Sequence, residues 1–271
     1  MKSDINFEVK QPKNGYGDQA YWQWSILPLV EEKYWKSTKA VVNKVQYEWR
    51  RRLYKLRKAG YPPLQNRYVF ARNCPPAGVW VNQTSRQCHL DRICPFCWGR
   101  TYVFQCWSRL IPTLFAKEGK RSHRDRNLIR AARTWRFDNL DTALRAVRAD
   151  RKVELDKLTK SYDGYFGAAK LVQFYPDEQS LNGVFMRVAT IVTVPDQSDY
   201  VPVFEQFGYK AKLYEQVTKQ DLVQIVGRHA AFSSKLFRCD AKAAAKLLES
   251  LKGFRTCSYY GDMTQAASKI D

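Results

Sequence analysis

Residues 171–194, LVQFYPDEQSLNGVFMRVATIVTV, contain two runs of strand-forming residues on either side of a turn. The runs are 171–174 and 185–194, and they are rich in β-branched and aromatic side chains. Between them, residues 176–183 carry Pro, Asp, Ser, Asn and Gly, which favour turns. This stretch therefore predicts two consecutive β-strands joined by a turn.

Helical patterns flank these strands on both sides. Residues 138–158 begin with an Asp-Asn pair that can cap a helix, and they continue with leucine and valine at helical spacing. Residues 240–251 predict a further helix, capped by Asp240 and ended by Gly253, and residues 254–260 predict a last strand. Because helices and strands mix without strict alternation, we expect an α+β fold.

The composition of the 271-residue chain is strongly basic, with 46 Lys and Arg against 26 Asp and Glu and a formal net charge of +20. The 45% hydrophobic and 14% aromatic residues exclude wholesale disorder, and no apolar run approaches the roughly 20 residues of a membrane helix. The surplus charge favours a polyanionic partner, nucleic acid before an anionic membrane surface. No secretory signal is visible in the polar first residues, so we expect a cytoplasmic protein that does not bind membranes.

Two segments concentrate the positive charge. Residues 20–58 predict helix, in one or two pieces, ended by Gly60 and the Pro62–Pro63 pair; within it, residues 47–58 (YEWRRRLYKLRK) alternate cations with Trp, Leu and Tyr. Such a helix can bury one stripe and expose a basic face that follows phosphates. Residues 119–136 are basic as well. The cations that we expect at phosphates here and in the cysteine segment are Arg50, Arg51, Arg52, Lys55, Arg57, Arg92, Arg100, Arg121, Arg124, Arg126 and Arg130.

Four of the seven cysteines form a cluster with the pattern Cys74-x13-Cys88-x5-Cys94-Pro-Phe-Cys97. Two thiolates separated by two residues have the spacing of structural zinc knuckles. In a chain without a secretory signal, such a cluster favours metal binding over disulfides. Cys74 and Cys88 would complete a tetrahedral site that leaves no position for water, which predicts a structural zinc ion.

Other residues offer alternatives to this assignment. His89 and Cys106 are rival candidates for the fourth ligand, and the CxxC pair alone could also be a redox motif or incidental. We expect Cys239 and Cys257 to be ordinary buried thiols. Tryptophans near the basic segments pack in a core in most proteins, but they can stack on the bases of a single-stranded ligand. These tryptophans are Trp98, Trp107 and Trp135.

Five patches of the chain occur in the order found in a known family. Residues 88–100 (CHLDRICPFCWGR) resemble the motif C-x2-R-x-C-P-x-C-x2-R, with one extra residue after the first cysteine. The four later patches are 127–135, 164–175, 183–192, and 226–237 with 247–261. Over about residues 66–262, the chain thereby resembles the rolling-circle replication initiators (Rep proteins) of small bacterial plasmids, which are HUH endonucleases. The later patches resemble that family's first strand, the strand before its histidine motif, its histidine strand, and its tyrosine helix with the closing strand.

The chemistry of that family depends on residues that this chain lacks at the matching positions. In the family, histidines on one strand face hold a divalent metal at the scissile phosphate, often with a carboxylate, and a tyrosine attacks the phosphate. Here Gly183, Phe185 and Arg187 match the histidines, Lys170 matches the carboxylate and His229 matches the tyrosine. The resemblance therefore implies an antiparallel sheet with flanking helices that has lost cleavage, with Lys170 and Arg187 near the old metal position and able to grip a phosphate.

We therefore expect a DNA-binding protein related to rolling-circle initiators, without endonuclease activity, acting in plasmid or phage DNA replication or its regulation. Its expected partners are duplex origin DNA or single-stranded DNA, with other replication proteins as further partners. Its expected parts are a basic helical segment (1–65), a zinc-binding cysteine module (66–110) and a Rep-like α+β domain (111–271). Three alternatives stay open: an active nicking-joining initiator with a divergent site, a protein that inhibits or loads a true initiator, and an RNA-binding protein.

Overall fold

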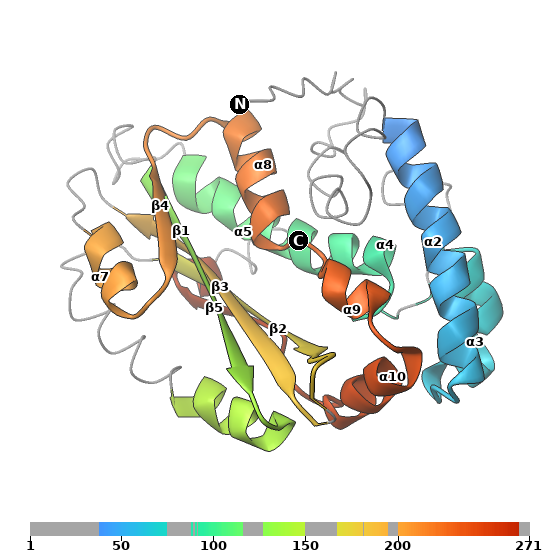
Figure 1. Ribbon diagram of the computed structural model, residues 1–271. Coiled ribbons are helices and arrows are strands. Elements are labelled where there is room, and N and C mark those ends of the chain that lie inside the picture. Colours follow the sequence, from blue (N-terminus) through green and yellow to red (C-terminus); the bar gives the residue numbers. More distant parts are fainter. Residues whose placement is uncertain are drawn as a thin grey trace. The chain divides into compact units, whose positions relative to one another are not determined.

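The protein has an α+β fold with a five-stranded antiparallel sheet, as the sequence predicts (Figure 1). The computed structural model describes residues 38–74, 88, 90, 92–115, 127–149, 167–180, 182–194 and 200–265. The strands are β1 (Asn127–Phe137), β2 (Gly167–Pro176), β3 (Val184–Val194), β4 (Lys210–Tyr214) and β5 (Cys257–Gly261). The helices are α2 (Thr38–Lys58), α3 (Pro63–Arg72), α4 (Pro95–Trp98), a π-helical turn (Gly99–Val103), α5 (Phe104–Phe115), residues 140–149, α7 (Tyr200–Gln206), α8 (Lys219–His229), α9 (Ser234–Arg238), α10 (Ala241–Ser250) and α11 (Asp262–Gln265).

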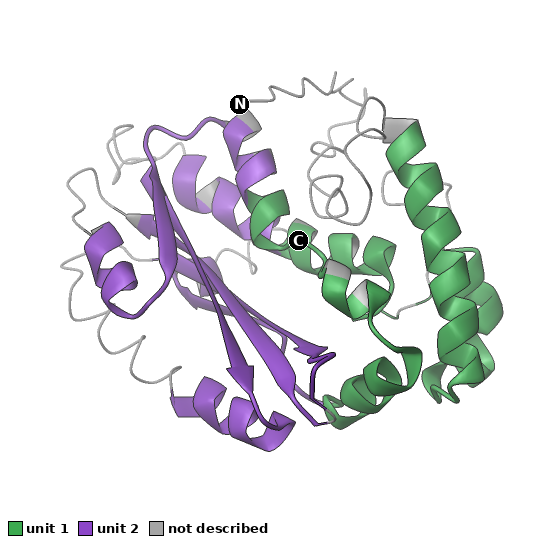
Figure 2. Cartoon of the chain, in the orientation of Figure 1, with its two compact units in different colours: residues 1–105, 226–252 green, residues 106–225, 253–271 purple. Residues whose placement is uncertain are grey.

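The chain forms two compact units (Figure 2). Residues 1–105 and 226–252 make up unit 1, and residues 106–225 and 253–271 make up unit 2. A segment from late in the sequence therefore joins the cysteine module, and the sheet is in the other unit. This division differs from the three consecutive segments that the sequence suggested.

The sheet of unit 2 has the strand order β4-β1-β3-β2-β5, with every neighbouring pair antiparallel. From β1 to β4, strands and helices follow one another as β-α-β-β-α-β, and the order 4-1-3-2 is the split β-α-β arrangement. The interior strands β1, β3 and β2 contribute most of the buried residues of this unit. Strand β2 is buried at every position except its last.

The two faces of the sheet differ in what they present. One face carries apolar side chains such as Ile129, Met186 and Val188, which are at most 1% exposed. On the opposite face, α5 covers the side formed by β2 and β5. There the Arg109 guanidinium lies 4.1 Å from the centroid of the Tyr259 ring, and its Nη1 donates a hydrogen bond to the Met263 carbonyl at 2.7 Å. The β1 and β4 side of this second face retains exposed positions.

Unit 1 is organised around the buried stripe of α2. The residues of this stripe recur at helical spacing, as expected for an amphipathic helix, and they are Val41, Val45, Trp49, Arg52, Leu53 and Leu56. The Trp49 indole Nε1 donates a hydrogen bond to the Ala71 carbonyl at 2.9 Å, so α3 returns along α2 as the second arm of a helical hairpin. Burial of these side chains therefore fixes the α2–α3 hairpin.

The end of α2 agrees with the sequence prediction. Gly60 has a φ of +78°, which suits glycine, and its N–H donates to the Arg57 carbonyl while the Tyr61 N–H donates to the Leu56 carbonyl. These two bonds are the Schellman motif that closes many helices. The helix α3, which starts at Pro63, was not predicted, because only Leu64 and Ala71 in it are buried and no apolar face marks it in the sequence.

The predicted strands at 171–174 and 185–194 are confirmed within the longer β2 and β3, and the predicted last strand is confirmed as β5. The Asp240 cap is confirmed too: its Oδ2 accepts a hydrogen bond from the Ala243 N–H at 2.9 Å. Strand β4 was missed because its sequence, KAKLY, reads as a polar segment; two lysines suit an edge strand, which must resist pairing with other chains.

Candidate metal centre and cationic surfaces

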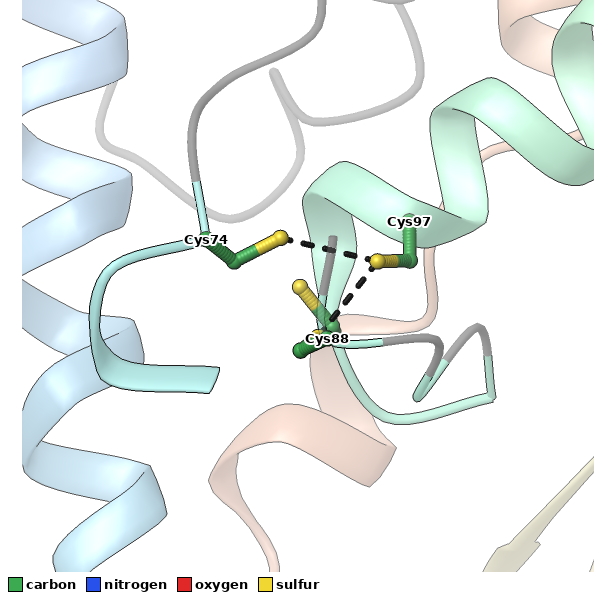
Figure 3. A group of neighbouring side chains, drawn as sticks. Cys74, Cys88 and Cys97 are labelled. Carbon is green, nitrogen blue, oxygen red and sulfur yellow. Dashed lines mark hydrogen bonds between the residues drawn. The ribbon is translucent and has the colours of Figure 1, made fainter. Parts of the chain in front are cut away.

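The four cysteines of the predicted zinc motif converge on one point of unit 1, and Figure 3 shows three of them, Cys74, Cys88 and Cys97. Their Sγ atoms all lie within 4.8 Å of one another, and the thiols of Cys74, Cys88, Cys94 and Cys97 are all buried. The Sγ of Cys97 lies 3.5 Å from that of Cys74 and 3.4 Å from that of Cys88. Four buried cysteines this close together could bind a metal ion such as zinc.

The spacing of the sulfur atoms fits a tetrahedral ion. With Zn–S bonds of about 2.3 Å, the sulfurs of a tetrahedral site lie about 3.8 Å apart. The sulfur distances of 3.4 and 3.5 Å, within a group that spans at most 4.8 Å, bracket that value. All four donors are soft thiol sulfurs, which suit zinc, and no carboxylate or water is needed to complete the shell.

Local structure explains how the sequence brings these thiols together. Cys74 follows α3 directly, and its N–H donates to the Ala71 carbonyl at 3.3 Å. Cys94 is the N-cap residue of α4, with Pro95 in the first turn, so Cys97 returns to the same side one turn later. The Cys94 N–H donates to the Leu90 carbonyl at 2.7 Å and tightens the knuckle. The two predicted ligands outside the CxxC pair are thus confirmed as members of the cluster.

The two rival candidates for the fourth ligand have different outcomes. Cys106 does not belong to this group of cysteines, and His89 lies outside the described residues.

The thiols of the cluster differ in their pKa values. Burial raises the pKa of Cys94, whereas hydrogen bonds from Cys88, followed by those from Cys94 and Cys97, hold the pKa of Cys74 well below its usual range. A bound divalent cation would stabilise all four sulfurs as thiolates.

The basic helix α2 exposes some of the predicted phosphate contacts and buries another. Arg50, Arg51, Lys55 and Arg57 are exposed. Arg52 is only 6% exposed, and its guanidinium donates to the carbonyls of Leu236 and Cys239. The prediction that Arg52 contacts phosphate is therefore wrong, because its donors hold α9 against α2. Its position was visible in the sequence, three residues after Trp49 and on the same helical stripe.

The structure describes only some of the cations predicted to contact phosphate in the cysteine segment and in the basic stretch after α5. Arg92 is half-buried, and its guanidinium donates to the Leu251 carbonyl, which ties the knuckle to the end of α10. Arg100 lies in the π-helical turn, and its side chain is outside the described part of the structure. The remaining predicted cations of this stretch lie outside the described residues, and they are Arg121, Arg124 and Arg126.

A cationic and aromatic surface lies on the second face of the sheet, the one that α5 covers in part. Alternation along the paired strands places its residues on one face. We call it the basic sheet face, and its cations are Arg130, Arg136, Arg187, Lys210 and Lys212, with the half-buried rings of Phe185 and Tyr214 among them. Tyr175 lies on the same face but is only 5% exposed. Arg136 forms an ion pair with Asp177, with its Nε 2.5 Å from Oδ2. The Tyr175 and Phe185 rings stack at 5.4 Å, and Lys212 Nζ lies 5.0 Å from the Tyr214 centroid.

Arg130 and Arg187 lie on this face, and the charge of Arg130 affects the pKa of Arg187. Arg187 Nη1 donates to Gln173 Oε1 at 2.7 Å. Burial and then the nearby charge of Arg130 lower the pKa of Arg187 to about 10, which leaves the guanidinium charged at neutral pH. The strand positions between the two arginines carry the small residues Ala132 and Ala189, paired with each other. An anion such as a phosphate would relieve the repulsion between the guanidinium groups.

Lys170 does not join Arg187 at this surface. It pairs with Thr190 on β3, three residues from Arg187, so its side chain projects from the opposite face of the sheet. It is also only 5% exposed. The prediction that Lys170 and Arg187 grip one phosphate together is therefore wrong, because strand positions that differ by an odd number, such as 187 and 190, lie on opposite faces of the sheet. His229, at the end of α8, is buried.

The tryptophans are packed to different degrees. Trp98 is 3% exposed, and its Nε1 donates to the Ala230 carbonyl at 2.6 Å, which assigns it to the core of unit 1. Trp135 is half-buried between the Arg133 guanidinium, 4.3 Å from its ring centroid, and the edge of Tyr209. Trp107 is half-buried on α5. Trp98 is therefore too deeply buried to stack on a base.

The prediction that Cys239 and Cys257 are buried thiols is confirmed.

Comparisons with known proteins add no family to these observations. No protein-family model, curated protein or solved structure matches the chain. In the described part of the chain, no helix combines the length and apolar character needed to cross a membrane. The features of the protein that point to a function are therefore the cysteine cluster, the exposed face of α2 and the basic sheet face.

Proposed function

We propose that the protein binds DNA through its cationic surfaces and does not cut it, and that the cysteine cluster holds a structural zinc ion. The observation that carries this proposal is the pair Arg130 and Arg187 on the basic sheet face. Both guanidinium groups project from the same face of two paired strands, and burial, followed by the charge of Arg130, lowers the pKa of Arg187; a bound phosphate would stabilise the two charges together. Aromatic rings beside cations on the same face suit a nucleic acid with accessible bases.

We propose further that the sheet is a Rep-like core with a role in plasmid or phage DNA replication or its regulation. Support comes from the order of elements, because a strand and helix (β1 and residues 140–149), two strands (β2 and β3) and a closing strand (β5) follow the order of the family's patches. The absence of cleavage rests on the residues that match the catalytic ones: Phe185 and Arg187 on β3 cannot ligate a metal as histidines do.

Zinc would act on structure rather than on a substrate. Bound by four thiolates, it would cross-link α3, α4 and the segment around Cys88 within unit 1. Such a closed shell leaves no open position at which a water or phosphate could be activated. Within unit 1, the metal would then hold α3, and through it the exposed face of α2, in place without touching DNA itself.

The test of DNA binding replaces the two arginines of the basic sheet face. Arg130→Ala with Arg187→Ala should weaken binding to a 30-nucleotide single strand at least tenfold and reduce the salt slope by about two phosphate contacts. The matched control, Arg145→Ala with Arg148→Ala, removes the same charge from two exposed positions of the helix at 140–149. Equal losses for both double variants would show that only net charge matters and would reject the basic sheet face.

Cleavage is tested separately. Supercoiled plasmid incubated with the zinc-loaded protein and Mg²⁺ or Mn²⁺ should stay uncut. Site-specific nicking, with a tyrosine covalently joined to the DNA end, would show an active enzyme and would reject the non-cleaving part of the proposal while leaving DNA binding in place.

A further inference from the structure

Helix α3 presents an outer face that its packing does not use. Its inner side meets α2: Trp49 Nε1 donates to the Ala71 carbonyl at 2.9 Å, and the Arg57 guanidinium lies 4.5 Å from the Tyr68 ring centroid. Leu64 and Ala71 are the buried side chains of the helix. Residues three and four apart share a helix face, so the opposite side is turned outward. Its members are Gln65, Asn66, Val69, Phe70 and Asn73, all exposed.

The chemistry of this outer face is unusual for a solvated surface. Val69 is 67% exposed and Phe70 is 51% exposed, although both are large and apolar. Beside them stand the two side-chain amides of Gln65 and Asn66. Amide side chains can bond an adenine edge in a bidentate manner, and apolar side chains contact the methyl group of thymine, both in the major groove.

The positive charge around α3 favours an anionic ligand for this outer face. Between residues 49 and 74 the chain contains no Asp or Glu. Its cations there are Arg50, Arg51, Arg52, Lys55, Arg57, Lys58, Arg67 and Arg72. With the exception of the buried Arg52, these cations are exposed, so the α2–α3 hairpin that carries the amide and apolar face has a strongly positive surface. An anionic duplex matches this surface, whereas an apolar protein partner would leave the cations unmatched.

The position of α3 is fixed at both ends, as a reading helix requires. At its start, the Schellman turn at Gly60 and the Pro62–Pro63 pair set the angle from α2. At its end, the chain enters the cysteine cluster at once through Cys74. An element that reads base edges must be held with little freedom, and bracing from α2 and the cysteine cluster supplies this.

We propose that α3 lies in the major groove of duplex DNA, with Gln65, Asn66 and Phe70 against base edges and exposed cations of α2 on the flanking phosphates. The groove, about 12 Å wide, admits one α-helix. This inference rests on the proposed function, DNA binding, and it adds duplex recognition with sequence preference at a surface separate from the basic sheet face.

The experiment selects duplexes from a pool with 20 random base pairs, using the full zinc-loaded chain. The wild type should enrich a common motif. Asn66→Ala should bind the enriched duplex about fivefold or more weakly, with unchanged affinity for a scrambled duplex, because one base contact is lost and the phosphate contacts stay. Asn43→Ala, which removes an exposed amide from α2, is the matched control and should keep motif and affinity.

The outcomes separate this inference from the proposed function. If the wild type binds duplexes without enriching a motif, or if Asn66→Ala keeps the motif and the affinity, α3 is not a reading helix, although DNA binding stands. If the wild type retains no DNA at low salt, both proposals fail. If Phe70→Ala changes the oligomeric state in sedimentation while the Asn66→Ala variant enriches the wild-type motif, the outer face contacts a second copy of the chain, and the inference is overturned.

Discussion

Replacing one cysteine of the cluster should unfold unit 1, and Cys97 is the most informative choice because its Sγ contacts those of Cys74 and Cys88 at 3.5 and 3.4 Å. We predict that Cys97→Ser releases the zinc ion, since a hydroxyl is a much poorer zinc ligand than a thiolate. The wild type should carry about one zinc ion per chain. Metal content is measured after dialysis, with a chromogenic chelator in denaturant.

The expected loss of stability is large. Structural zinc contributes about 10–16 kcal/mol of apparent binding free energy in zinc-finger peptides at pH 7, whereas whole domains are stable by about 5–15 kcal/mol. The four thiols are at most 3% exposed, so an empty cluster would also leave polar groups buried without a metal. Unit 1 should therefore lose cooperative folding, and hydrogen exchange should show loss of protection in α2, α3 and α10.

The matched control is Cys106→Ala. This thiol is also buried, but it does not belong to the cluster, so the variant should keep the zinc ion. A Cys97→Ser protein with native protection in unit 1 would refute the reasoning. Loss of zinc from Cys106→Ala with retention in Cys97→Ser would show that the ligand set is wrong.

Two further predictions concern unit 1. Arg52→Met removes the donors to the Leu236 and Cys239 carbonyls and should lower the free energy of unfolding, measured in urea, by about 3 kcal/mol. Arg51→Met, at an exposed site, should change this free energy by at most about 0.5 kcal/mol. Equal effects of the two variants would contradict the structural role of Arg52. Asp240→Ala should cost about 1 kcal/mol at neutral pH through the lost helix cap. The cap lowers the pKa of Asp240, so this difference should persist above pH about 4 and fade as the pH falls through the carboxyl's own lowered pKa; a difference that grows in acid would contradict it.

The cysteine cluster was predictable because its information is local. Two thiols two residues apart can reach one ion in a single knuckle, and cysteine has few other reasons to recur at this spacing. Helix ends were predictable for the same reason: Gly60 and Asp240 act within four residues of the chain, through a positive φ and a side-chain cap.

Arg52 and Lys170 show what a charge pattern cannot specify alone. A run of arginines on a helix turns by 100° per residue, so Arg50 and Arg51 face water while Arg52 joins the stripe of Trp49. The face of Lys170 depends on strand register, which is set by pairing with β3. The basic sheet face combines residues from strands that only their pairing brings together. Helix α3 could not be predicted because its apolar residues do not recur at helical spacing.

The central claim is that the protein is a DNA-binding protein, and the dependence of its DNA affinity on salt tests this most directly. The wild-type chain is titrated against a fluorescent 30-base-pair duplex and the corresponding single strand between about 50 and about 300 mM NaCl, a range over which the Debye length falls from about 14 Å to about 6 Å. Binding that weakens linearly in log–log form, with a slope of about −4 or steeper for five or more phosphate contacts, is the predicted result. No binding at 50 mM NaCl, or an affinity that salt leaves unchanged, would contradict it.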